Sequence, residues 1–192
     1  DPVKEEAKAL IQNLKSRGIT TWLISGDEQE TTRTIGEELQ FEHVKGRSLP
    51  KNKVETIIAL QQQGKRVGMV GDGTNDAAAL ARADVGFAMG TGSDIAQKAS
   101  DISFLSDSLR RLPDVLELSA LTLKTIRQNF CFAFIYNIIG IPVAAGLLYP
   151  AFGLYLKPEF AGLAMSFSSV SVVTNSLLLK RFAHRLKKPE GY

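Results

Sequence analysis

The sequence contains one cysteine, Cys131, and no internal repeat in its 192 residues. One cysteine cannot form an intramolecular disulfide or a cysteine-rich zinc site, so small disulfide-stapled secreted folds and zinc modules are excluded. Hydrophobic residues make up 44% of the chain and charged residues 22%. This composition excludes a disordered or low-complexity polypeptide, because it provides enough apolar surface to offset the entropy lost on ordering.

Charge is absent from two long stretches in the C-terminal part. No charged residue occurs in the 29 positions between Arg127 and Lys157, or in the 20 positions between Glu159 and Lys180. As a helix, each stretch can span roughly 30 Å of hydrocarbon. The sequence therefore predicts a transmembrane helical hairpin, with helices over 129–149 and 159–180 and an external loop over 150–158.

Basic residues gather at the ends of these apolar stretches. They are Lys124 and Arg127 before the first, and Lys180, Arg181, Arg185, Lys187 and Lys188 after the second. By the positive-inside rule, we expect the N-terminal part and the basic tail over 181–192 to be cytoplasmic. The tail carries no nucleic-acid-binding motif, so we expect no nucleic-acid partner.

The first 107 residues alternate between strand-like and helix-like patterns. Strands are predicted over 20–25, 43–47, 66–70, 85–89 and 102–105, with amphipathic helices before and between them. This alternation predicts an α/β fold with a Rossmann-like, doubly wound parallel sheet. A connecting helix over 108–128 continues into the first apolar stretch without a linker. It either transmits movement or only anchors the domain, and the sequence leaves both roles open.

The most informative loop follows the predicted strand 66–70 and reads GDGTND over 71–76. Asp72 and Asp76 are four residues apart, and Gly71 and Gly73 flank the first of them. Two carboxylates on such a loop suit a hard cation that keeps several waters and also meets a phosphate. We therefore expect Asp72 and Asp76 to bind Mg²⁺. A helix-capping turn is the alternative, but it explains one of these residues and not the cluster.

Two further segments offer groups that could bind phosphate. Ser25, Gly26 and Asp27 follow the predicted strand 20–25 and provide a hydroxyl and backbone N–H groups. Lys53 lies near the start of the predicted helix 50–63 and can place a point charge on the same phosphate. Taken alone, each segment is also compatible with an ordinary turn or a solvated lysine.

The combination of these motifs resembles the phosphorylation domain of P-type ATPases, a branch of the haloacid dehalogenase superfamily. The matching elements are GDGTND followed by AAAL at 71–80, SGD at 25–27, and the Pro-x-x-Lys that ends at Lys53. The resemblance implies that Ser25 and Lys53 contact the phosphoryl group and that Asp72 and Asp76 bind magnesium. It also implies that Asn75 supports the acyl-phosphate site.

By the same resemblance, Gly26 and Asp27 belong to the loop that positions the phosphate and the attacking water. The family usually has asparagine after this tripeptide, where this chain has Glu28. The sequence lacks the strand Asp-Lys-Thr-Gly-Thr, whose aspartate accepts the phosphate, and it lacks the actuator and nucleotide-binding domains. Since it also begins at Asp1 rather than Met, we expect a piece of a longer pump, inactive alone, whose ATP is bound mainly by the missing domains.

The apolar stretches favour a soft transported ion, because they contain no carboxylate or lysine. Ca²⁺ would require carboxylates, whereas Cu(I) prefers thiolate and thioether ligands. The pair Tyr136-Asn137 and the run MSFSS at 165–169 resemble motifs of copper-transporting P-type ATPases. The resemblance implies that Tyr136, Asn137, Met165 and Ser169 line a copper path.

The expected function is therefore that of a fragment of an ATP-driven Cu(I) export pump that works through an aspartyl-phosphate. We expect an integral protein of the plasma (inner) membrane, with the lipid bilayer and the missing pump domains as partners and a copper chaperone as a candidate partner. A zinc or cadmium P-type pump, a membrane-tethered phosphatase of the same superfamily and a non-catalytic regulatory fragment remain alternatives.

Overall fold

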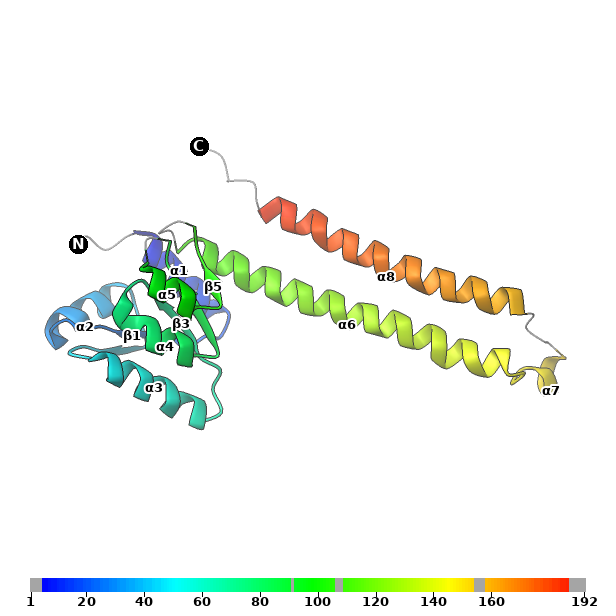
Figure 1. Ribbon diagram of the computed structural model, residues 1–192, viewed down its shortest axis with the longest axis horizontal. Helices are drawn as coiled ribbons and strands as arrows, with labels where there is room; N and C mark the ends of the chain where they lie inside the picture. Colours follow the sequence, from blue (N-terminus) through cyan, green and yellow to red (C-terminus); the bar gives the residue numbers. More distant parts are fainter. Residues whose placement is uncertain (1–4, 91, 106–108, 154–157, 187–192) are drawn as a thin grey trace. The chain divides into compact units, whose positions relative to one another are not determined.

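The computed structural model describes residues 5–90, 92–105, 109–153 and 158–186 (Figure 1). The side chains of residues 5, 158–161, 163–165 and 182–186 lie outside the described part. The chain divides into two compact units, Asp1–Pro113 and Asp114–Tyr192. The first unit contains both strands and helices, and the second is helical.

The first unit confirms the predicted alternation of helices and strands. Its elements in chain order are α1 (Glu5–Ser16), β1 (Trp22–Ile24), α2 (Gln29–Glu38), β2 (His43–Lys45), α3 (Pro50–Gln62), β3 (Gly68–Gly71), the 3₁₀ turn η1 (Thr74–Asp76), α4 (Ala77–Arg82), β4 (Val85–Ala88), α5 (Asp94–Ala99) and β5 (Ile102–Ser103). The strands are shorter than the predicted ranges, and β3 ends at Gly71, one residue beyond its predicted range.

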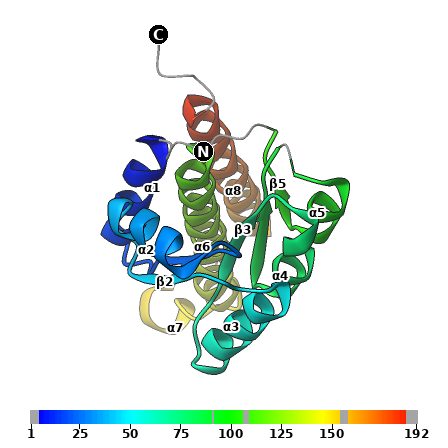
Figure 2. The same ribbon diagram turned by 90° about the vertical axis from the view of Figure 1, so that its left-hand side faces the viewer.

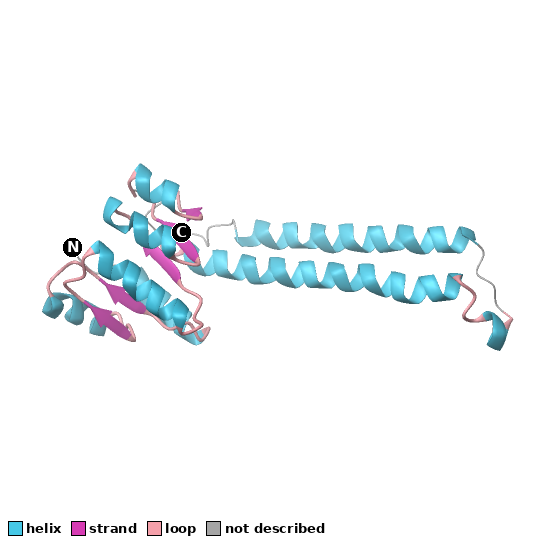
Figure 3. Cartoon of the chain, turned by 60° about the horizontal axis from the view of Figure 1, so that its bottom comes forward, coloured by secondary structure: helices cyan, strands magenta, loops and turns pink. Residues whose placement is uncertain are grey.

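All strand pairings are parallel, as predicted, but the described strands form two sheets instead of one continuous sheet (Figure 3). In the first sheet β1 pairs with β2, and Trp22 lies opposite His43. In the second, β3 pairs with β4 and β4 with β5. No ladder hydrogen bonds between the two sheets are found among the described strands.

The second sheet is packed tightly against α4, which lies between α3 and α5 (Figure 2). Ala79 and Leu80 of α4 are fully buried, and Phe87 of β4 stacks on Phe104 with ring centroids 6.1 Å apart. A Cβ atom at Gly86 would lie 2.7 Å from the Leu80 carbonyl oxygen, so glycine permits this close approach. This packing fixes the position of η1, which follows the end of β3 along the chain.

Asp84, just before β4, is hydrogen-bonded to α3 and to the segment that leads into β3. Its carboxylate accepts from Gln61 Nε2 at 2.9 Å, from the Val67 backbone N–H at 2.9 Å and from Arg66 Nη1 at 3.0 Å. The Gln61 bond, followed by the Val67 and Arg66 bonds, lowers the pKa of Asp84 from 3.8 to about 2. The charged carboxylate therefore stabilises the folded unit.

We expect Asp84→Asn to lower the stability of the chain at neutral pH, because the amide is uncharged and presents an N–H₂ group to these donors. A carboxyl whose pKa is depressed on folding contributes stability above its ordinary pKa and loses it as the pH falls through the folded value. The difference between wild type and variant should therefore shrink between pH 3.8 and about 2. Urea unfolding at a series of pH values measures it. A difference that does not change with pH contradicts the assignment.

The second unit contains two long helices with a short one between them. They are α6 (Arg111–Ala144), α7 (Tyr149–Phe152) and α8 (Pro158–Leu186). Gly146 and Gly153 have φ angles of +93° and +63°, a left-handed conformation that glycine tolerates and that interrupts the helices. Over the described residues, none of the helices combines the length and hydropathy that crossing a bilayer requires. The transmembrane hairpin predicted from the sequence is thus not confirmed.

Candidate functional site

Three loops lie at the carboxyl ends of the parallel strands, where α/β sheets bind ligands, and together with the start of α3 they carry the predicted phosphate-site residues. Residues 25–28 follow β1, residues 46–49 connect β2 with α3, and residues 72–76 follow β3. Backbone hydrogen bonds join the first two loops. The Ser48 N–H donates to the Ser25 carbonyl at 2.9 Å, and the Arg47 N–H donates to the Asp27 carbonyl at 2.6 Å.

A short, largely buried polar contact joins Lys53 to Asp76. Lys53 lies in the first turn of α3, whose start is stabilised by Pro50 and by the Asn52 side chain, which accepts from the Leu49 N–H at 3.0 Å. Lys53 Nζ lies 2.6 Å from Asp76 Oδ1, and the two side chains are 14% and 11% exposed. Removing either partner of such a largely buried pair leaves the other charge without compensation.

The Asp76 carboxylate lies against the backbone of the glycine-rich loop. A Cβ atom at Gly71 would lie 2.8 Å from Asp76 Cβ and 3.0 Å from Oδ2, whereas one at Gly73 would lie 4.0 Å from Oδ2. Asp72, between these glycines, is exposed. The loop therefore brings one exposed carboxylate and one buried carboxylate into the same turn.

These two carboxylates fit a magnesium ion. Mg²⁺ in phosphate-handling sites takes one or two carboxylates and fills its other positions with phosphate oxygens and water. Lys53 engages Oδ1 of Asp76, while Oδ2 lies beside the loop that carries Asp72. In the described part of the chain, no group of three or more His, Cys, Asp or Glu residues is placed to bind a metal. With two carboxylates, the remaining ligands of the ion would be phosphate oxygens and water.

Ser25 and Asp27 form a closed turn at the end of β1. The Ser25 hydroxyl donates to Asp27 Oδ2 at 2.7 Å, and the Asp27 N–H approaches Ser25 Oγ at 3.3 Å. Gly26, between them, is exposed. In this conformation the Ser25 hydroxyl proton is directed to Asp27, so a phosphate oxygen that accepts it would replace Asp27 as the acceptor.

A surface hollow of about 440 Å³ connects the three loops. It is lined by Gly26, Arg47, Ser48, Leu49, Pro50, Lys53 and Asn75. The structure therefore brings together Gly26, Lys53 and Asn75, which the sequence analysis had predicted to handle phosphate. Asp72 is not part of the lining.

Arg47 is the charged residue at this hollow that the sequence motifs did not predict. Its φ angle of +49° is uncommon for arginine. Its guanidinium group lies 3.8 Å from Glu28 Oε1, and both side chains are largely exposed, so this ion pair is weak and leaves the cation available to an anion. No local pattern marks Arg47, because it precedes the Pro-x-x-Lys motif and acquires its position only from the backbone bond to Asp27.

The predicted copper-path residues belong to the second unit. Tyr136 is half-buried and Asn137 is exposed on α6, and Ser169 is exposed on α8. Met165 belongs to α8, but its side chain lies outside the described part. The role of these residues stays a prediction.

Comparison with known proteins relates the chain to a family. Residues 1–84 match the family described as haloacid dehalogenase-like hydrolase. The chain is 50% identical over 182 residues to a probable copper-transporting ATPase, PacS, of Synechocystis sp., which covers 95% of this chain and 24% of that protein. A probable copper-exporting P-type ATPase of Archaeoglobus fulgidus is 47% identical over 188 residues, or 98% of this chain and 23% of that protein.

The chain is homologous to copper-transporting P-type ATPases. A crystal structure of a zinc-transporting PIB-type ATPase in the E2.Pi state is similar to this chain, with a TM-score of 0.81 and 32% identity. The match covers 93% of this chain and 28% of that protein. The first unit thus has a haloacid dehalogenase-like α/β fold. The chain spans about a quarter of the length of the two curated copper ATPases that it matches.

Proposed function

We propose that this chain is the part of an ATP-driven Cu(I) export pump that supplies the magnesium-binding and phosphate-binding groups of the phosphorylation site and part of the copper path. The contact of Lys53 with Asp76 at the end of β3 carries this proposal, since it brings a cation next to a carboxylate that could bind a metal ion. The similarity to copper-transporting ATPases over nearly the whole chain supports it.

The phosphorylation chemistry follows from the charges in the site. A transferred phosphoryl group carries negative charge on its oxygens, and catalysis consists mainly of holding it in line and stabilising that charge. Lys53 would stabilise an equatorial oxygen, Ser25 and the N–H groups of Gly26 and Asp27 would bind others, and Asn75 would support the group from the hollow. Asp72 and Asp76 would hold Mg²⁺, which when bound supplies positive charge to the phosphate.

The aspartate that accepts the phosphate would come from a strand outside this sequence. The unpaired edges of β1 and β3, within the described residues, are suitable neighbours for a parallel strand. Both strands end in phosphate-site loops, so a strand inserted between them would deliver an aspartate at its carboxyl end to the same point. This insertion would join the two sheets into one.

The second unit would carry the copper path across a membrane. The two uncharged stretches of 29 and 20 residues support this proposal, as do the exposed large apolar side chains of α6, among them Phe130, Phe134, Ile138 and Ile141. The first unit and the basic tail would then be cytoplasmic at the plasma membrane. The remaining pump domains, which would bind most of the ATP, and a copper chaperone are the proposed partners.

A chimeric pump tests the proposal. In it, residues 1–192 replace the homologous quarter of the Synechocystis relative, and copper-stimulated ATP hydrolysis is measured. We expect the chimera to be active and Asp72→Asn and Asp76→Asn each to lower its rate about 100-fold or more, because each removes charge stabilisation at the phosphate. Glu55→Gln, an exposed carboxylate on α3, is the control and should leave the rate unchanged. Full activity of both aspartate variants would refute the proposal.

A zinc pump is the second candidate, because the zinc-transporting PIB-type ATPase shares the fold over most of this chain. Cu(I) prefers soft thioether sulfur, so Met165→Leu should weaken copper stimulation of the chimera about tenfold. Ser166→Ala, which alters a hydroxyl bonded to its own helix at Gly162, is the control. Stimulation by zinc and not by copper would favour the second candidate and leave the ATPase assignment intact.

A further inference from the structure

A cluster of polar side chains joins α6 to α8 in the second unit. Asn175 Nδ2 donates to Asn129 Oδ1 at 2.9 Å and approaches Gln128 Oε1 at 3.3 Å. In return, Asn129 Nδ2 donates to Ser176 Oγ at 3.0 Å. We call Gln128, Asn129, Asn175 and Ser176 the amide clamp. Its hydrogen bonds run between the helices, unlike that of Thr122, which bonds to Leu118 of its own helix.

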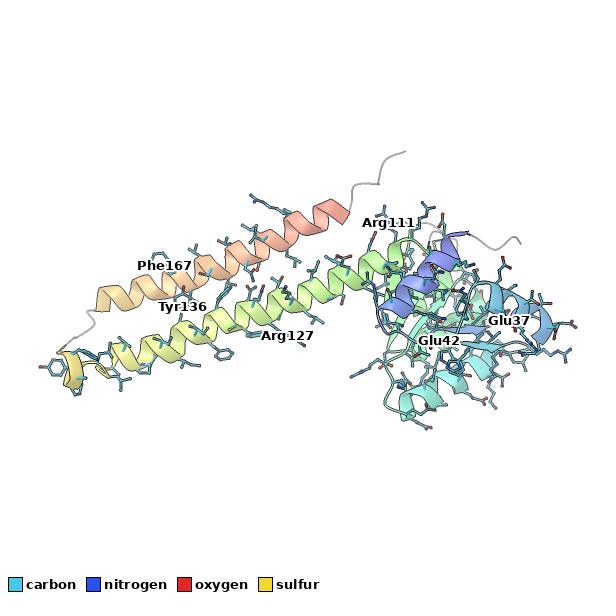
Figure 4. The ribbon with its side chains drawn as sticks, turned by 180° about the vertical axis from the view of Figure 1, so that it is seen from behind. Glu37, Glu42, Arg111, Arg127, Tyr136 and Phe167 are labelled. Atoms are coloured by element: carbon cyan, nitrogen blue, oxygen red, sulfur yellow. The ribbon has the colours of Figure 1, made fainter. Side chains whose placement is uncertain are left out.

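The amide clamp defines which residues of the two helices lie level. In an antiparallel pair, each step of about 1.5 Å along one helix matches a step backwards along the other. With Asn129 opposite Asn175, a displacement of seven residues brings Tyr136 level with Ser168. Figure 4 shows Tyr136 between the two ribbons, while Phe167 projects from the far side of α8.

Burial supports the same register independently of the hydrogen bonds. Half-buried positions on α6 recur at Thr125, Asn129, Ala133 and Tyr136, and half-buried positions on α8 recur at Leu179, Asn175, Ser171 and Ser168. Taken in this order, each α6 residue faces the α8 residue at the same place in the series. One register therefore accounts for both the hydrogen bonds and the contact face.

Small side chains alone would select this register weakly. Ala133 and Ser171 have little shape to interlock, so a slip of one turn, about 5.4 Å, would keep comparable packing. Paired amides oppose such a slip, because it would leave their donors and acceptors without partners. A single polar position at a helix interface is a known means of specifying register.

We propose that the amide clamp is a positioning element that holds Tyr136 level with Ser168, so that Asn137 and Ser169 each lie one residue from that level. This inference rests on the proposed function only in treating Tyr136, Asn137 and Ser169 as residues of the copper path. Asn129 and Asn175 act through the helix register and do not themselves touch the ion.

Disulfide cross-linking tests the register in the full chain reconstituted in lipid vesicles. On a Cys131→Ser background, Ala133→Cys is combined either with Ser171→Cys, the level partner, or with Ser168→Cys, one turn away. The oxidant is diamide, which takes two electrons and two protons from the thiol pair as the disulfide forms. With the native clamp, the level pair should cross-link about tenfold faster than the displaced pair, because a disulfide tolerates only a narrow range of Cα separations.

In the double variant Asn129→Leu/Asn175→Leu, the rate advantage of the level cysteine pair over the displaced pair should fall to about twofold or less. The reason is that slippage of the helices no longer breaks hydrogen bonds between amides. Each single variant should lose nearly as much as the double variant, because both remove the same hydrogen bond. Thr122→Leu/Ser166→Leu is the matched control. It removes two hydroxyls that bond within their own helices, and it should keep the preference.

An unchanged preference in the double leucine variant would overturn the proposal, as would an equal loss in the control. Disappearance of both cross-links would also overturn it, because the clamp would then hold the helices together instead of choosing their register. None of these measurements uses copper or ATP, so the inference can fail while the proposed function stands. Conversely, a chimera without copper-stimulated hydrolysis would refute the function and leave the register intact.

Discussion

Replacing Lys53 by alanine should lower the rate of phosphoenzyme formation in the chimeric pump by about 100- to 1,000-fold, the usual cost of removing a preorganised group that stabilises transition-state charge. The substitution should also disturb Asp76, because Lys53 Nζ lies 2.6 Å from Asp76 Oδ1 in a largely buried contact. Without the ammonium group, the Asp76 carboxylate loses its compensation and its fixed position. Both effects act on the same step, which is measured by incorporation of labelled phosphate from ATP.

Lys51 provides the matched control on the same helix. Its side chain is 86% exposed and its ion pair with Glu55 measures 3.8 Å, so Lys51→Ala should leave phosphorylation within about twofold of the wild-type rate. Lys53→Arg should recover only part of the loss, since the guanidinium is larger and planar where a compact ammonium fits. Equal rates for Lys53→Ala and Lys51→Ala would show that Lys53 is an ordinary helix lysine.

Replacing Gly71 by alanine should produce the second large effect. The new Cβ would lie 2.8 Å from Asp76 Cβ and 3.0 Å from Oδ2, so the carboxylate must move away from the loop. We expect a destabilisation of about 1–3 kcal/mol from overpacking. The displaced carboxylate should also raise the Mg²⁺ concentration that gives half-maximal phosphorylation by about tenfold or more.

Gly73→Ala tests whether this effect is specific to Gly71. The nearest atoms to a Cβ at Gly73 are Asn75 N at 3.8 Å and Asp76 Oδ2 at 4.0 Å, which are ordinary contact distances. This variant should therefore keep its Mg²⁺ dependence. Chemical denaturation of the chain and a Mg²⁺ titration of the chimera provide the two readouts. If both variants change the Mg²⁺ dependence equally, Gly71 has no special relation to Asp76.

Much of the first unit could be predicted from local patterns. The strands near Trp22, Val44, Val70 and Phe87 occur where short β-branched or apolar runs end in glycine-rich loops, and parallel pairing follows from the helices between them. Local patterns could not predict that the described strands form two sheets, because sheet continuity depends on the position of each strand relative to its neighbours. That position is not encoded in the spacing of any single segment.

The candidate site likewise combines residues that local patterns predicted with contacts that depend on tertiary packing. The spacing of Asp72 and Asp76 predicted a two-carboxylate loop, and the Pro-x-x-Lys motif drew attention to Lys53. The contact between Lys53 and Asp76 joins residues 23 positions apart, and it depends on how α3 packs beside η1. Arg47 also reaches the hollow only because its backbone bonds to the Asp27 loop.

The sequence by itself determined the kinds of element, the polar loops at the strand ends and the two uncharged stretches, because these depend on the side chains of neighbouring residues. Only the tertiary structure decided that Lys53 compensates the charge of Asp76, that Gly71 makes room for that carboxylate, and that Asn129 pairs with Asn175. The physical reason is that each of these contacts joins elements distant in the chain. Their distances are set by how helices and strands pack and not by residue spacing.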